Sequence, residues 1–143
     1  RWHQAEAAYL EATKGYTRRR RLGPLLSVWG RLAWVYFETN RKTPEESIRQ
    51  ALAYSQRFKL RPLQVGLEVA LGLGGPSSDG VAYFQSAWTN ADALQLRGLG
   101  ARARYLFSRR FPEHSERDLR LKEALRDCGL NTPLKVLIKA EMC

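Results

Sequence analysis

The sequence predicts an all-α protein in which antiparallel helix hairpins stack in series as an α-solenoid. The first observation is a junction that recurs: Leu-Gly-Pro-Leu at 22–25 returns as Leu-Arg-Pro-Leu at 60–63 and as Leu-Arg-Gly-Leu at 96–99. A weaker echo is Asn-Thr-Pro-Leu at 131–134. Counted at the Pro or Gly position, the steps are 38, 36 and 35 residues. Self-similarity at this period is typical of helical-repeat proteins.

The second observation is another series of turn signals that interleaves with the first. Thr43-Pro44, Gly75-Pro76 and Phe111-Pro112 divide each repeat in two. The segments between signals are about 12 to 18 residues long, which is the length of a helix rather than a strand. The expected helices are 3–19, 24–39, 44–58, 62–73, 80–95, 98–110, 115–127 and 133–141.

The third observation is that two kinds of helix alternate. Type A follows the recurring junction and is apolar on several faces, as in 25–36. Type B is amphipathic, with Ile48, Ala51 and Leu52 on one stripe. Leu10, Ile48, Phe84 and Leu119 are expected to be equivalent type B positions, because their spacings are the same 38, 36 and 35 residues. The chain is therefore expected to form one domain, 1–143, of about three full pairs plus partial end units.

Local signals support individual helix ends. Thr43-Pro44-Glu45-Glu46 has a capping hydroxyl, a proline at the first helical position and a glutamate three residues after the cap. Ser115 begins a weaker version of the same start. Gly74-Gly75-Pro76 is expected to end the helix before it.

Composition restricts the class of protein. The 143 residues suffice for one domain, and the formal net charge is +10. Cys128 and Cys143 have no metal or redox spacing, which suits a reducing, cytoplasmic compartment. The longest apolar stretch, 28–37, is too short to span a bilayer, so no membrane association is expected. Because the chain begins with Arg1, we expect it to be an excised piece of a longer protein.

One unit carries a recognisable motif. Trp-Gly-Arg-Leu-Ala-Trp-Val-Tyr at 29–36 resembles the tetratricopeptide signature, W-x2-L-[G/A]-x2-Y. The units around Leu67 and Ala103 retain only side-chain size and apolarity. Long, degenerate repeats of this kind resemble those of large bacterial transcription regulators of the LuxR/MalT and SARP types. The resemblance implies a right-handed superhelix whose type A helices line a concave groove for partner peptides.

The sequence offers little for catalysis, a metal or another cofactor, and none is expected. His3 and His114 are the only histidines, and each is interpreted as a solvated loop or terminal residue. Cys128 is interpreted as a small apolar side chain. The glycine-rich segment 72–76 lacks the lysine and the spacing of a phosphate-binding loop. We therefore expect no enzyme.

Two basic clusters are candidate binding features. Arg18, Arg19, Arg20 and Arg21 are candidate contacts for an anion or nucleic acid, with a solvated helix end as the alternative. A second row lies on and just before 98–110. Seven-residue spacing places Arg97 and Arg104 on one face of that helix, and Arg102 and Arg109 on another. Which face is open stays undecided, and solvated surface is an equal alternative.

These observations favour a non-enzymatic interaction module, a scaffolding or ligand-sensing part of a larger regulatory protein. The expected partner is a protein or an acidic peptide, bound by Trp34, Arg97, Arg102 and Arg104. Arg104 is expected to line the groove or, alternatively, to pair with an acid such as Asp118. A helical-repeat nucleic-acid binder is the competing interpretation, since the chain is strongly basic. Self-association through uncapped ends is also expected.

Overall fold

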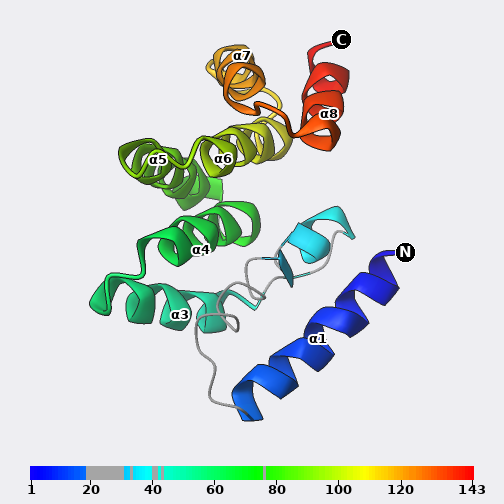
Figure 1. Ribbon diagram of the computed structural model, residues 1–143. Helices are drawn as coiled ribbons and strands as arrows, with labels where there is room; N and C mark the ends of the chain where they lie inside the picture. Colours follow the sequence, from blue (N-terminus) through cyan, green and yellow to red (C-terminus); the bar gives the residue numbers. More distant parts are fainter. Residues whose placement is uncertain (19–30, 33, 40–41, 43, 76) are drawn as a thin grey trace.

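The computed structural model describes residues 1–18, 31–32, 34–39, 42, 44–75 and 77–143 of the chain. These residues form helices and no strand, as the sequence predicts. Residues 31–32 and 34–38 are also helical, and we call them the Trp34 segment. The complete helices are α1 (Trp2–Arg18), α3 (Glu45–Arg57), α4 (Arg61–Gly74), α5 (Ser77–Ala93), α6 (Arg97–Arg110), α7 (Arg117–Asp127) and α8 (Thr132–Met142) (Figure 1).

From α3 onward, each helix packs against the next one in the chain (Figure 1). In addition, α4 contacts α6, and α6 contacts α8, whereas α3, α5 and α7 make no such contacts with one another. The expected type A helices therefore touch along one layer, and the expected type B helices lie outside them. This arrangement buries α4 and α6 on several sides, as their apolar composition requires.

The two turns that lead from α3 to α4 and from α5 to α6 share one backbone conformation. Lys59 and Gln95, 36 positions apart, have φ of 56° and 58°. The next residues, Leu60 and Leu96, donate their N–H groups to carbonyls five residues earlier, both at 2.8 Å. This is the hydrogen bond of a Schellman motif, usually built with glycine at the left-handed position. The repeated sequence interval thus corresponds to a repeated local structure.

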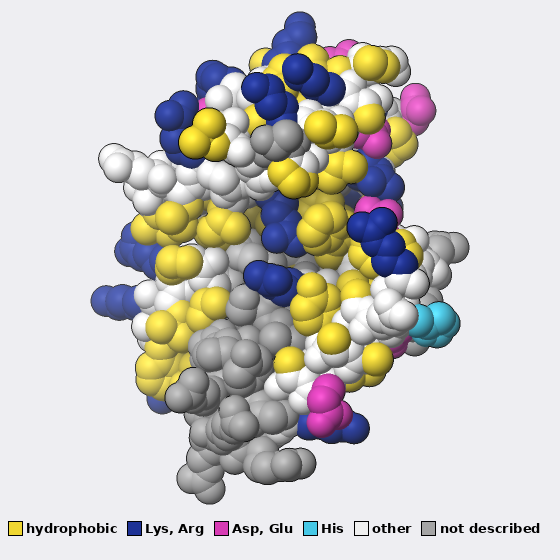
Figure 2. Space-filling model, turned by 45° about the vertical axis from the view of Figure 1, so that its right-hand side comes forward, with side chains coloured by type: hydrophobic (Ala, Val, Ile, Leu, Met, Phe, Trp, Pro, Cys, Tyr) yellow, Lys and Arg dark blue, Asp and Glu magenta, His cyan; other side chains and the backbone are white. Residues whose placement is uncertain are grey.

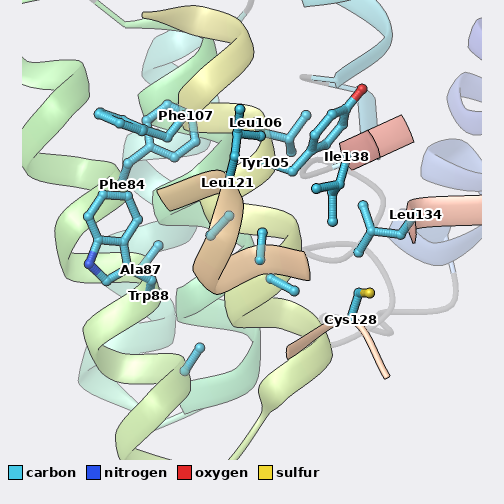
Figure 3. Packing of buried hydrophobic residues seen from close by; sticks show 14 of the residues in the cluster. Phe84, Ala87, Trp88, Tyr105, Leu106, Phe107, Leu121, Cys128, Leu134 and Ile138 are labelled. Atoms are coloured by element: carbon cyan, nitrogen blue, oxygen red, sulfur yellow. The ribbon is translucent and has the colours of Figure 1, made fainter. Parts of the chain in front are cut away.

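The larger core cluster joins α4, α5, α6, α7 and α8 (Figure 3). Phe107 lies at its centre, edge-on to Phe84 at 5.9 Å and to Trp88 at 5.2 Å between ring centroids. Gly72 of α4 lets Phe84 approach closely, because a Cβ at Gly72 would lie 2.7 Å from the ring. A smaller cluster joins α3 to the other side of α4. Its centre includes Ile48 and Ala51, both buried as the stripe predicts.

Several local expectations need correction. Ile48 and Phe84 are fully buried, but Leu10 and Leu119 are 39% and 51% exposed, so only half of that series lies in the core. Pro44 precedes α3 as its N-cap instead of occupying its first turn. Gly75 ends α4 as predicted, with an extended backbone at φ −80° and ψ 178°. Thr43, Pro76 and the junction at 22–25 lie outside the described residues.

No helix in the described ranges combines the length and the apolar composition needed to cross a bilayer.

Candidate binding groove

A groove with a volume of about 270 Å³ lies between the Trp34 segment, α4 and α6. Its walls are mainly apolar, and two arginines, Arg31 and Arg102, also line it. We call it the α4–α6 groove. On the face of the molecule in Figure 2, basic side chains lie among hydrophobic ones near the middle. The groove is lined by the aromatic ring of Trp34, by the backbone of Gly66, and by the apolar side chains of Pro62, Leu63, Val65, Val69, Leu73, Leu99 and Leu106.

The two predicted groove residues that meet here are Arg102 and Trp34. The guanidinium carbon of Arg102 lies 4.3 Å from the centroid of the Trp34 ring, which is cation–π geometry. Trp34 Nε1 donates a hydrogen bond to Glu38 Oε1 at 3.2 Å, and Arg109 donates to the same oxygen at 3.2 Å. The Glu38 carboxylate therefore holds the indole edge, leaving the ring face to Arg102. Arg102 and Arg109 lie on the same face of α6, as their spacing predicts, because both contact the Trp34 segment.

The groove carries positive charge without a matching acid in the described part of the chain. Burial lowers the pKa of Arg102, and the nearby charge of Arg31 lowers it further, while Tyr9 acts in the opposite direction. Among the described residues, no carboxylate forms an ion pair with Arg31 or Arg102. A guanidinium keeps its charge at neutral pH whatever the shift. The charge at Arg102 is therefore costly to the protein, and an anion beside it would lower that cost.

Gly66 leaves one wall of the groove open. It lies inside α4, where glycine costs about 1 kcal/mol of helix stability relative to alanine. A Cβ built at Gly66 would meet no atom within 4 Å, so packing does not require glycine there. Gly72 in the same helix is different, because Phe84 fills the space beside it. The absence of a side chain at Gly66 thus creates room in the groove.

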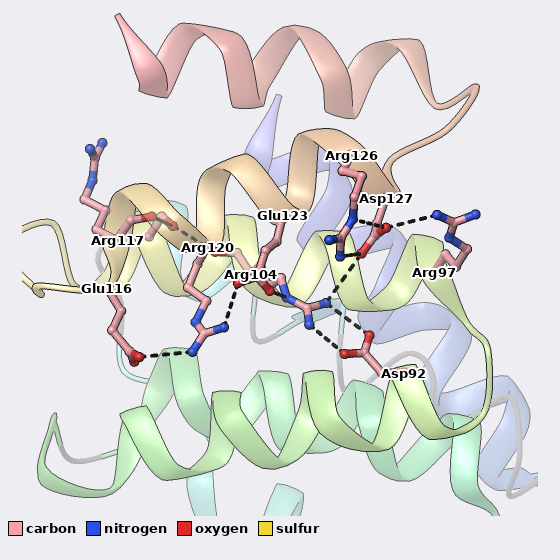
Figure 4. Close-up of polar contacts among 10 residues, drawn as sticks. Asp92, Arg97, Arg104, Glu116, Arg117, Arg120, Glu123, Arg126 and Asp127 are labelled. Carbon is pink, nitrogen blue, oxygen red and sulfur yellow. Dashed lines mark hydrogen bonds and ion pairs between the residues drawn. The ribbon is translucent and has the colours of Figure 1, made fainter.

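Arg104 lies away from the groove, enclosed between α5, α6 and α7 (Figure 4). It is 3% exposed. Its guanidinium pairs with Asp92 at 2.6 Å and with Glu123 at 2.9 Å. Burial alone would lower the pKa of Arg104, but the hydrogen bonds and charges of these two acids outweigh burial and raise it. Arg104 therefore does not line an open groove, and its acids are Asp92 and Glu123 rather than Asp118.

Arg97 shares the Arg104 side of α6, as its seven-residue spacing predicts. Arg97 and Arg104 both approach the carboxylate of Asp127, at 3.3 Å and 4.0 Å. A third cation, Arg126, pairs with Asp127 at 3.0 Å. The hydrogen bond from Arg126 and the nearby positive charges lower the pKa of Asp127, although burial acts in the opposite direction. The Arg97 side chain is 72% exposed, but it faces this acid rather than the groove.

The remaining predicted contacts are the four consecutive arginines at 18–21. Arg18 ends α1, and its side chain lies outside the described residues, as do Arg19, Arg20 and Arg21. The sequence reasoning did not select Arg31 or Gly66 for the groove. Both had a signal: Arg31 stands inside the tetratricopeptide-like motif, and Gly66 interrupts a helical pattern without ending it.

The groups expected to be inert have structural roles. His114 is not a freely solvated loop residue: its ring lies edge-on to Phe107 at 5.0 Å, and Nδ1 accepts a hydrogen bond from the Glu116 N–H at 3.1 Å. It therefore supports the start of α7. Cys128 is buried, as predicted. In the portion of the chain that is described, no group of three or more His, Cys, Asp or Glu side chains is placed to hold a metal ion.

Comparison with known proteins gives no match to any family model, to any curated protein or to any solved structure.

Proposed function

We propose that this chain is a non-enzymatic binding module of a larger regulatory protein, and that it binds its partner in the α4–α6 groove. The observation that carries the proposal is the groove itself. Its walls come from the Trp34 segment, α4 and α6 and are mainly apolar, and two arginines in its lining have no acidic partner among the described residues. Concave, mostly apolar sites with a few polar groups are the usual form of ligand sites.

The packing supports a tetratricopeptide-like α-solenoid with this groove on its concave side. The layer formed by α4, α6 and α8, and the two equivalent turns at Lys59 and Gln95, are what stacked helix pairs predict. In such an array the type A helices line the concave face. The groove is lined by α4, α6 and the Trp34 segment, which are all type A.

Site-specific photo-crosslinking in the parent cell tests the proposal. A photoreactive amino acid at Leu63 or Leu99 reports on the groove, and one at Gln85 of α5 is the matched outer control, because Gln85 is exposed outside the groove lining. We expect one discrete adduct from the groove positions and none from Gln85. Adducts from Gln85 alone, or the same adducts from all positions, would contradict the proposed site.

Nucleic-acid binding is a second candidate function, since the chain has a net charge of +10. The arrangement of α6 favours it less, because Arg97, Arg104 and Arg109 are paired with carboxylates. Those arginines do not form a continuous row for phosphates. Titration with mixed-sequence DNA and RNA at several salt concentrations tests this function. Binding that weakens steeply with salt would support it, whereas no binding at low salt would exclude it.

A further inference from the structure

The α4–α6 groove presents charge at one place and hydrocarbon elsewhere. Arg102 is stacked on Trp34, and Arg31 lies close enough to act on the charge of Arg102. The other described residues of the lining are apolar, and none of the described lining residues is acidic. A ligand that complements this surface therefore has one anionic group joined to an apolar body.

We propose that the α4–α6 groove binds a small amphiphilic carboxylate, whose carboxylate pairs with Arg102 and Arg31 and whose hydrocarbon portion packs against Val69, Leu73 and Leu99. This proposal rests on the proposed function and names the ligand class for the same groove. A guanidinium and a carboxylate match each other in shape and charge and form paired hydrogen bonds. The ring of Trp34 holds the planar guanidinium from one side, so its N–H edge remains available for such a pair.

The size of the groove favours a small molecule over a long peptide segment. Its volume of about 270 Å³ is just below the range of roughly 300–1,000 Å³ for drug-sized ligands. A fatty acid of medium chain length or an arylalkanoate has this size and the required chemistry. A peptide would place only one side chain in the groove, and its backbone would lie outside.

Isothermal titration of the 143-residue chain with octanoate tests the proposal, with octanamide and octylamine as ligands of matched length. We expect saturable binding of octanoate, binding of octanamide weaker by about 10-fold or more, and none of octylamine. A bromine next to the carboxylate, as in 2-bromooctanoate, should quench tryptophan fluorescence, and Trp34→Phe should remove that quenching. Quenching that persists in the Trp34→Phe variant would place the ligand elsewhere and overturn the proposal.

Two kinds of variant localise the site. Arg102→Gln should weaken octanoate binding by about 10- to 100-fold, while Arg61→Gln, which removes the same charge outside the groove, should not change it. Gly66→Leu should block the groove by adding a side chain into open space, so it tests the site without removing any contact. Gly98→Leu is its control, because Gly98 is also helical and open but does not line the groove.

The outcomes separate this inference from the proposed function. Equal binding of octanoate and octanamide, or no saturable binding of octanoate below its micelle concentration, would overturn the carboxylate assignment. If Gly66→Leu still prevents the groove adducts in cells in that case, the groove binds a partner of other chemistry, such as a peptide. If octanoate binds as expected and competes with the adducts, both proposals stand. Octanoate binding without any groove adducts supports the ligand class and contradicts the protein-partner form of the function.

Discussion

At the residue scale, two glycines of one helix are expected to respond oppositely to the same substitution. Gly66→Ala should raise the free energy of unfolding by about 0.5–1 kcal/mol, because alanine is the better helix former and the added Cβ meets open space. Gly72→Ala should lower it by about 1–3 kcal/mol, because the Cβ would lie 2.7 Å from the buried ring of Phe84. Urea unfolding of both variants measures the two effects. A loss of stability at Gly66 would mean that its surroundings are more crowded than the structure shows.

Arg104 gives a second prediction at this scale. Arg104→Gln should lower the free energy of unfolding by about 1–3 kcal/mol, because the buried guanidinium bonds both Asp92 and Glu123. Glu123 keeps its ion pair with Arg120 and Asp92 is half exposed, so neither carboxylate becomes a buried, unpaired charge. The same change at Arg102 should alter stability much less, since its guanidinium stacks on Trp34 and no described acid depends on it. Thermal unfolding of both variants measures this difference. Equal losses would contradict the separate roles given to the two faces of α6.

At the element scale, the repeated turns before α4 and α6 store a small strain. Lys59 and Gln95 adopt a left-handed conformation that side chains with a Cβ rarely adopt. Lys59→Gly and Gln95→Gly should each stabilise the protein by about 0.5–1 kcal/mol, because glycine relieves the strain at these positions. Ala53→Gly, in the exposed interior of α3, should instead destabilise by about 1 kcal/mol. If all three variants lose stability, the turns are not strained.

The ion pairs that join α6 and α7 should make stability depend on pH. The folded-state pKa of Asp127 is lowered by Arg126 and Arg97, so its contribution is fully present above the unfolded value of about 3.9. It is lost as the pH falls through the folded-state pKa. We therefore expect the stability difference between the native chain and Asp127→Asn to be constant from pH 7 to about pH 4, and to shrink below that. Urea unfolding across this range measures it, and a difference that persists at lower pH would contradict a charge-based role.

The sequence could predict the helices but not the choice of groove face. Turn residues and apolar periodicity are local signals, and they gave α4 and α6 to within one residue at each end. The arginines of α6 occupy two faces, and a helical period relates residues of one helix without showing which face meets which neighbour. That choice depends on where Asp92 and Glu123 lie, which only the packing of three helices determines. The sequence therefore predicts partner contacts for both Arg102 and Arg104, and only Arg102 lines the groove.

At the scale of the whole molecule, the charge of +10 is unevenly compensated. The described arginines of the α6–α7 region are mostly paired, whereas the groove arginines have no acid among the described residues. A positive charge that the protein itself neutralises contributes little to binding a distant partner. Arg31 and Arg102, two of the cations that have no acidic partner among the described residues, thus lie where the proposed ligand binds.

Helix α8 has an exposed apolar face through which the chain is expected to self-associate. Leu134 and Ile138 of α8 are buried in the core. On another side of the helix, Val136 is 61% exposed and Leu137 is 41% exposed. Pro133, Val136, Leu137 and Ala140 have the spacing of one helical face, and all four are exposed. An exposed apolar helix face of this kind is a candidate surface for contact with another helix. A second copy of the chain can cover this face in the same way that α7 covers α6. We therefore expect a concentration-dependent dimer in sedimentation analysis.

Leu137→Lys should return the chain to a monomer, because a lysine on this face would bury a charge in the dimer. Its helicity and melting temperature should remain close to those of the native chain, since Leu137 is not part of the core cluster. Lys139→Glu is the matched control, because it changes charge on α8 outside the apolar face. A native chain that stays monomeric at high concentration, or a Leu137→Lys variant that still dimerises, would show that α8 is not the association surface. In the second case the dimer must form through another part of the chain, and the exposed Leu119 on α7 would be the next position to substitute.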